Sequence, residues 1–149
     1  MLRRDLLLSA VSCYAVFASE TQPDPWPPAD LIEPDSFAKQ LPSKPDKLLV
    51  ICVGFPVLYR AAHITGAVLA GPCSKPQGLT DLRKFAANLP HDRQIVLYCG
   101  CCPFAQCPNI RPAYTALHSM PFANLKVLHL PTNLHTDWIL KGYPVEKNL

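Results

Sequence analysis

Short apolar runs alternate along this chain with segments whose apolar residues recur at helical spacing. A short apolar run between turn residues predicts a buried strand, and such runs occupy residues 48–53, 67–70, 94–98 and 125–130. Helices are predicted over residues 34–41, 78–89, 109–120 and 132–140. Asp35 or Ser36 is expected to cap the first helix, and Thr80 or Asp81 the second. This alternation predicts an α/β fold with a parallel sheet between helices.

The length and composition favour a single globular domain that does not bind nucleic acid. The chain has 149 residues, of which 49% are apolar and 17% are charged, as in compact folded proteins. The net charge is only +3, and no basic cluster appears beyond pairs such as Arg3-Arg4. Nucleic-acid binding proteins usually carry a basic patch, so we expect no nucleic-acid partner.

Residues 1–18 have the pattern of an export signal and resemble the twin-arginine type. Arg3-Arg4 provides the positive region, and the apolar segment from Leu6 to Ala18 is too short to span a bilayer as a mature helix. We therefore expect a protein exported to the periplasm or the extracellular space, without stable membrane insertion after cleavage. Residues 19–30 then form a proline-rich linker, and residues 31–149 form the folded domain.

The third predicted strand is followed directly by a cysteine-rich loop, with four cysteines in nine residues: Cys99, Cys101, Cys102 and Cys107. Loops at the carboxyl ends of parallel strands hold the ligand sites of open α/β sheets. Pro108 suits the first position of the next helix. A thiol between a strand end and a helix start feels unpaired N–H groups, which favour the thiolate. This loop is therefore the expected seat of chemistry.

Export changes how the cysteines are interpreted. Removal of Cys13 with the signal leaves six cysteines, and an even number in an oxidising compartment is typical of disulfides. Four of the six lie in one loop, however, and cannot connect distant segments. Local redox, sulfur or metal chemistry explains this distribution better. Cys52, at the end of a predicted strand, is expected in the core, whereas Cys73 is expected as an isolated loop thiol.

Three segments resemble the rhodanese-like family. Residues 59–67, with Tyr59 and the run His63-Ile64-Thr65-Gly66-Ala67, resemble the first family signature. Residues 95–99 look like the strand that ends in the persulfide-carrying cysteine. Residues 122–128, followed by Trp138 and residues 142–145, resemble the closing signature. The resemblance implies a central, mostly parallel sheet flanked by helices on both faces, in which His63 is buried and structural.

The resemblance also implies a rhodanese-type sulfurtransferase. Cys99 would attack a thiosulfate-type donor and carry its sulfur as a persulfide to a thiol acceptor, with no required cofactor. The substrate-binding loop would comprise Gly100, Cys101, Pro103 and Phe104, and Arg111 would attract an anionic donor. This chain differs from the family in two respects. Cys52-Val53-Gly54 replaces the usual Asp-x-Arg, and the cysteine loop is longer.

The remaining loop cysteines leave several alternatives open. Cys102 or Cys107 resolves a persulfide or sulfenate on Cys99 as a partner thiol, or the two form a local disulfide that braces the loop. Alternatively, Cys99, Cys102 and Cys107 bind a soft metal ion such as Cu(I) or Zn(II). In that case the protein is a non-enzymatic binder. Thiol–disulfide redox chemistry without sulfane sulfur is a further possibility.

Overall fold

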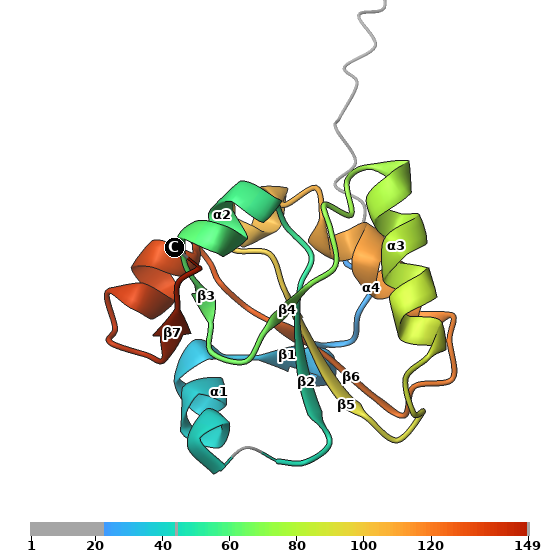
Figure 1. Cartoon of the computed structure of the whole chain (residues 1–149), viewed down its shortest axis with the longest axis horizontal. Helices are drawn as coiled ribbons and strands as arrows, with labels where there is room; N and C mark the ends of the chain where they lie inside the picture. Colours follow the sequence, from blue (N-terminus) through green and yellow to red (C-terminus); the bar gives the residue numbers. More distant parts are fainter. Residues whose placement is uncertain (1–22, 44, 149) are drawn as a thin grey trace, which may run out of the picture.

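A five-stranded sheet runs through the middle of the molecule (Figure 1). The computed structural model describes residues 23–43 and 45–148. In spatial order, the strands are β1 (Leu31–Ile32), β6 (Asn124–Leu128), β5 (Gln94–Tyr98), β2 (Leu48–Cys52) and β4 (Val68–Leu69). Every neighbouring pair is parallel. The predicted parallel sheet is therefore confirmed.

Helices cover both faces of this sheet. One face packs against α3 (Pro76–Ala87) and α4 (Ile110–His118), which contribute Leu82 and Leu117 to the core. The other face packs against α1 (Pro34–Gln40) and a short π-helix, His135–Ile139, through Phe37 and Trp138. Figure 1 shows α3 and α4 on one side of the sheet and α1 on the other.

The burial of the central strand β5 on both faces explains why its sequence is a continuous apolar run. Ile95 and Leu97 point into the core under α3 and α4, whereas Val96 and Tyr98 point into the core under α1. All four side chains are buried. Because successive side chains of a strand face opposite sides, a strand covered on both faces needs apolar residues at every position.

The helices begin earlier than the predicted caps indicated. The first helical residues are Pro34 in α1 and Pro76 in α3. The predicted caps are therefore wrong, and Thr80 instead donates its hydroxyl hydrogen bond to the Pro76 carbonyl within α3. The physical reason is that proline, whose φ is already helical and whose missing N–H is not needed there, sets the start.

The start of α4 also differs from the prediction. Asn109 precedes the helix, which begins at Ile110, so Pro108 is not its first residue. The loop before it includes a short 3₁₀ turn, Phe104–Gln106, and Cys107 after that turn is extended. The N–H groups of Asn109 and Ile110, two and three residues after Cys107, therefore lie close to the Cys107 sulfur.

Several short elements have no clear pattern in the sequence. The helix α2 (Pro56–Ala61) follows β2, and the two-residue strands β3 (His63–Ile64) and β7 (Val145–Glu146) pair antiparallel. The predicted final helix is limited to the π-helix, and the strand predicted at 67–70 is limited to β4. Two-residue strands are too short for side-chain alternation to be visible.

The described part of the predicted linker packs against the domain. Trp26 is 6% exposed, and its ring lies 5.4 Å from that of Phe104 and 5.5 Å from that of Tyr114, measured between centroids. A 3₁₀ turn, Pro28–Asp30, then leads into β1. The predicted export signal lies outside the described residues and stays a prediction. Among the residues that are described, no helix has the length and apolar character needed to cross a bilayer.

Candidate functional site

Cys99 lies on the wall of a cavity where β5 ends. It directly follows the last residue of that strand, and its side chain is partly buried. The cavity has a volume of about 340 Å³. It is bounded by α2, the start of the cysteine loop and the π-helix region. The predicted nucleophile therefore lies at the carboxyl end of a parallel strand, next to a space that a small substrate could enter.

The cavity wall is mostly apolar. Leu58 and Ala61 contribute from α2, Ala62 from the residue after it, and Leu134 and Ile139 from the π-helix region. Tyr59 and Asn133 add polar groups. Of the described lining residues, His135 is the side chain that can become positively charged. The remaining lining residues are Cys52, Tyr98, Cys99, Gly100 and Cys101.

Two glycines allow the backbone to pass closely around Cys99. Gly100 has a φ of +72°, and a Cβ there would lie 2.7 Å from the Leu134 Cβ. The Leu134 N–H donates a hydrogen bond to the Gly100 carbonyl at 3.1 Å. A Cβ at Gly54 would lie 3.1 Å from the Cys99 Sγ. Gly54 occupies the last position of the family's Asp-x-Arg signature, and here it leaves room for the Cys99 sulfur.

Three sulfur atoms of the loop form a compact cluster. The Sγ atoms of Cys99, Cys101 and Cys107 all lie within 4.8 Å of one another. Cys99 Sγ and Cys101 Sγ are 3.1 Å apart, which is longer than the roughly 2.05 Å of a disulfide bond. Cys102 Sγ lies 3.2 Å from Cys101 Sγ but is not part of the three-sulfur group. Cys101 therefore replaces Cys102 in the predicted ligand set.

The clustered cysteines differ in electrostatic character. A hydrogen bond from the Cys99 thiol, together with N–H groups of Asn109 and Ile110, lowers the pKa of Cys107 to about 6. The same interaction with Cys107, followed by burial, raises the pKa of Cys99. The amides at the start of α4 therefore favour a thiolate on Cys107, and the expectation that they would do so on Cys99 is wrong. The reason is that Cys107 is the cysteine beside the helix start.

Cys99 receives hydrogen bonds from other donors. The Cys101 N–H interacts with its sulfur and acts to lower its pKa, although less strongly than the opposing causes raise it. The Nδ2 of Asn109 donates to Cys99 Sγ at 3.4 Å and to Cys101 Sγ at 3.8 Å. Asn109 is fully buried, and its Oδ1 accepts a hydrogen bond from the Ser74 N–H at 2.8 Å. This bond fixes the amide with its NH₂ group toward the sulfurs.

The other cysteines are held as neutral thiols. Burial raises the pKa of Cys52 to about 11 and that of Cys73 to about 12. Cys52 is a core residue as predicted, and it also lines the cavity. Cys73 is a free thiol in the turn between β4 and α3, as predicted, but it is fully buried and donates to the Ala70 carbonyl. Burial and the hydrogen bond with Cys101 raise the pKa of Cys102 to about 12.

The outer part of the cysteine loop contacts the N-terminal segment rather than the cavity. Arg111 pairs with Asp24 at 2.6 Å, and its guanidinium lies 5.4 Å from the centroid of the Trp26 ring. Arg111 does not line the cavity, so the structure does not support its predicted role in attracting a donor. Phe104 packs against Trp26 and lines a much smaller space beside Cys107, whereas Pro103 is exposed.

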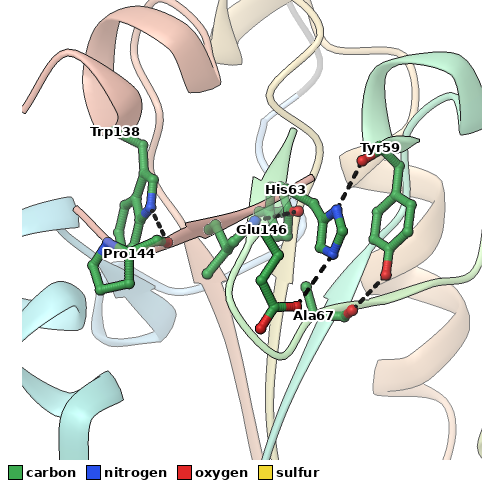
Figure 2. A network of polar contacts seen from close by, with 8 residues as sticks. Tyr59, His63, Ala67, Trp138, Pro144 and Glu146 are labelled. Carbon is green, nitrogen blue, oxygen red and sulfur yellow. Dashed lines mark hydrogen bonds and ion pairs between the residues drawn. The ribbon is translucent and has the colours of Figure 1, made fainter. Parts of the chain in front are cut away.

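His63 has the structural role that was predicted. It is 2% exposed, and its Nδ1 lies 2.8 Å from the Tyr59 carbonyl oxygen while its Nε2 lies 3.5 Å from a Glu146 carboxylate oxygen. Figure 2 shows this network, in which the Tyr59 hydroxyl donates to the Ala67 carbonyl. Trp138 packs in the core, and its Nε1 donates to the Pro144 carbonyl. His63 in β3 thus connects Tyr59 of α2 with Glu146 of β7.

Sequence reasoning did not identify three residues that shape the site. Asn109 orients hydrogen bonds toward two sulfurs, Gly54 makes room for Cys99, and Leu134 packs over Gly100. Asn109 follows the last loop cysteine by two residues, and the sequence marked it only as the predicted helix start. An asparagine directly before a helix is common as a cap. Its place in the sequence therefore gave no sign that its side chain contacts the thiols.

Comparison with known proteins supports the fold by structure alone. No family model and no curated protein sequence matches this chain. Among solved structures, a protein from Bacillus halodurans is similar with a TM-score of 0.61 and 17% identity, covering 79% of this chain and 77% of that chain. The rhodanese-like domain of an Anabaena protein has a TM-score of 0.57 and 21% identity, with 79% of each chain covered.

A thiosulfate sulfurtransferase from Pseudomonas aeruginosa is also similar. The TM-score is 0.59 with 13% identity, and the match covers 80% of this chain but only 20% of that chain. These similarities extend over most of the described residues. The chain therefore has the rhodanese-like fold that its sequence signatures predicted.

Proposed function

We propose that this chain moves sulfane sulfur from a thiosulfate-type donor to a thiol acceptor through a persulfide on Cys99. The observation that carries the proposal is the position of the Cys99 sulfur, on the wall of the cavity at the carboxyl end of β5. The rhodanese-like fold supports the proposal. So does the proximity of Cys107, which can exchange a proton with Cys99 within the sulfur cluster.

In the first step, the Cys99 sulfur attacks the outer sulfur of the donor. The Cys99 thiol proton passes to the Cys107 thiolate, whose sulfur lies within 4.8 Å of the Cys99 sulfur. The S–S bond of thiosulfate breaks, and its electron pair leaves with sulfite. The products are a persulfide anion on Cys99, a neutral Cys107 thiol and sulfite, so atoms and charge balance. The Cys101 N–H and the Asn109 Nδ2 are the nearby donors that stabilise the charge on Cys99.

In the second step, the persulfide takes a proton from solvent and meets an acceptor thiolate in the cavity. The acceptor attacks the outer sulfur, the persulfide S–S bond breaks, and the electron pair returns to the Cys99 sulfur. Cys107 then gives its proton back to Cys99. The largely apolar wall formed by Leu58, Leu134 and Ile139 favours an acceptor with an apolar body next to its thiol.

When no acceptor is present, Cys107 is the partner thiol that the geometry favours over Cys102. Its sulfur belongs to the same three-sulfur group as Cys99, whereas that of Cys102 does not. Attack of Cys107 on the inner sulfur of the persulfide forms a Cys99–Cys107 disulfide and releases hydrosulfide. A thiol reductant then restores both cysteines.

The test is persulfide formation by Cys99→Ser compared with Cys73→Ser. The wild-type protein, reduced and then exposed to thiosulfate, should gain one sulfur atom on the peptide that contains Cys99. Cys99→Ser should lose that gain and its thiosulfate-dependent turnover with a thiol acceptor. Cys73→Ser should retain both, because Cys73 is buried away from the cavity and serine can keep its hydrogen bond to Ala70. Sulfur found on Cys101 or Cys107 with Cys99 unmodified would exclude the proposed role of Cys99.

A further inference from the structure

We propose that Cys99, Cys101 and Cys107 form a binding site for a single Cu(I) ion. This assignment does not depend on the proposed sulfur transfer, because it rests on the arrangement of the sulfur atoms in the absence of any donor. The Sγ atoms of the three cysteines lie within 4.8 Å of one another. They come from the end of β5 and from the residue before the turn into α4, so the fold brings both sides of the loop together.

The spacing of the sulfurs fits one ion rather than a larger cluster. A metal–sulfur bond of about 2.3 Å places three ligands roughly 4.0 Å apart around a trigonal ion. Cys99 Sγ and Cys101 Sγ are 3.1 Å apart and would need to separate by less than an ångström. The Cys107 sulfur lies no more than 4.8 Å from either of them, so it also needs to move by less than an ångström. Small rotations of the side chains are therefore sufficient, with no change in the path of the backbone.

The surroundings of the sulfurs suit negatively charged ligands. The Asn109 Nδ2 donates toward Cys99 and Cys101, and the N–H groups of Asn109 and Ile110 point to Cys107. Hydrogen bonds of this kind orient metal ligands and spread their charge. Cys107 is 4% exposed, so protein shields the ion on that side. Each ligand that is still a neutral thiol releases its proton to solvent when it binds the ion, and copper supplied as Cu(I) needs no electron transfer.

The number and type of ligands favour Cu(I) over zinc. Thiolates select soft ions, and structural zinc sites are closed by four ligands in a tetrahedron. The nearest additional sulfur is that of Cys102, 3.2 Å from Cys101 Sγ but outside the three-sulfur group. A three-sulfur site without a fourth protein ligand matches the low coordination number that Cu(I) accepts.

The experiment is a titration of the fully reduced full chain with Cu(I) held by a coloured chelator, under anaerobic conditions and without any sulfur donor. We expect one ion per chain. Cys101→Ser should weaken the affinity by more than about a hundredfold, above the range for loss of a hydrogen bond to a ligand. Cys102→Ser should change it less than about threefold. Cys73→Ser is the matched control, and circular dichroism checks that each variant is folded.

Three results would overturn the assignment. The first is no Cu(I) bound by reduced wild-type protein, and the second is an unchanged affinity in Cys101→Ser. The third is a loss in Cys102→Ser as large as that in Cys101→Ser, particularly if Zn(II) alone then binds with four sulfur neighbours in X-ray absorption. Three sulfur neighbours around copper would support the proposal. Because metal binding is measured directly, a failure of sulfur transfer leaves this result interpretable.

Discussion

Cys99 and Cys107 are close enough to share a proton, but the residues around them treat the two sulfurs differently. The Cys99 thiol and the N–H groups of Asn109 and Ile110 lower the pKa of Cys107, whereas Cys107 and burial raise the pKa of Cys99. The shared proton therefore resides on Cys99, and the negative charge on Cys107. This arrangement keeps Cys99 ready to react, because a base that can accept its proton lies within 4.8 Å of its sulfur.

This asymmetry predicts that Cys107 is a thiolate at neutral pH. The pKa of Cys107, about 6, lies below the ordinary thiol value of 9.0, so its negative charge is present at pH 7 and disappears as the pH falls through 6. The ultraviolet absorbance of the thiolate, measured on metal-free reduced protein, should show this transition. The transition should vanish in Cys107→Ser and persist in Cys73→Ser, because the pKa of Cys73 is raised to about 12. A transition that persists in Cys107→Ser would assign the charge to another cysteine.

The sequence identified the cysteine loop as the site but not the distribution of charge within it. The position of Cys99 after an apolar strand predicts its place at the sheet edge, and the structure confirms that place. Pro108 suggested an earlier start of α4 than the one observed at Ile110. Both starts lie shortly after Cys107, so it was the family resemblance, and not the position of the helix end, that assigned the thiolate to Cys99.

At the scale of elements, the close contact between α3 and the segment after β4 depends on Gly78. A Cβ at Gly78 would lie 2.0 Å from the carbonyl oxygen of Pro72. Backbone atoms cannot move aside as easily as the end of a side chain can. The contact therefore sets how closely α3 approaches the sheet, where Leu82 and Ala86 are buried.

We expect Gly78→Ala to destabilise the protein by about 2 kcal/mol, because α3 must shift away from Pro72. Gln77→Ala, at an exposed neighbouring position in the same helix, should change stability by less than about 0.5 kcal/mol. Chemical denaturation monitored by circular dichroism measures both free energies of unfolding. Equal stabilities of the two variants would show that α3 can move without loss of packing.

The longer elements could be predicted from the sequence, and the shortest could not. The runs that became β2 and β5 are continuous and apolar because both faces of the sheet are covered, whereas β6 contains Lys126, which is only partly buried. The pairing of β3 with β7 instead depends on contacts between distant residues, such as His63 with Glu146. The family resemblance marked this region, whereas hydrophobic periodicity did not.

At the scale of the whole molecule, the segment before β1 is part of the packed structure. Trp26 contacts Tyr114 of α4 and Phe104 of the cysteine loop, and Asp24 pairs with Arg111. Composition suggested a linker because prolines are concentrated there. A single buried indole outweighed that tendency, since its large apolar surface is removed from water.

We expect Trp26→Ala to lower the free energy of unfolding by about 3 kcal/mol, the lower end of the range for removing a large aromatic side chain. Val57→Ala is the control, because Val57 is 64% exposed and its loss should cost less than about 0.5 kcal/mol. Denaturant titration of both variants gives the comparison. If Trp26→Ala is as stable as the control, the segment contributes little to the folded state.

The packing of Trp26 against Phe104 gives the protein a natural optical probe. The indole is in contact with the same loop that contains Cys101, Cys102 and Cys107, so its emission responds when that loop changes shape or charge. The other tryptophan, Trp138, lies in the separate core beneath α1. The variant Trp138→Phe has Trp26 as its single tryptophan. Its fluorescence spectrum then follows the binding and release of sulfur or Cu(I) at the loop in real time, without an attached dye.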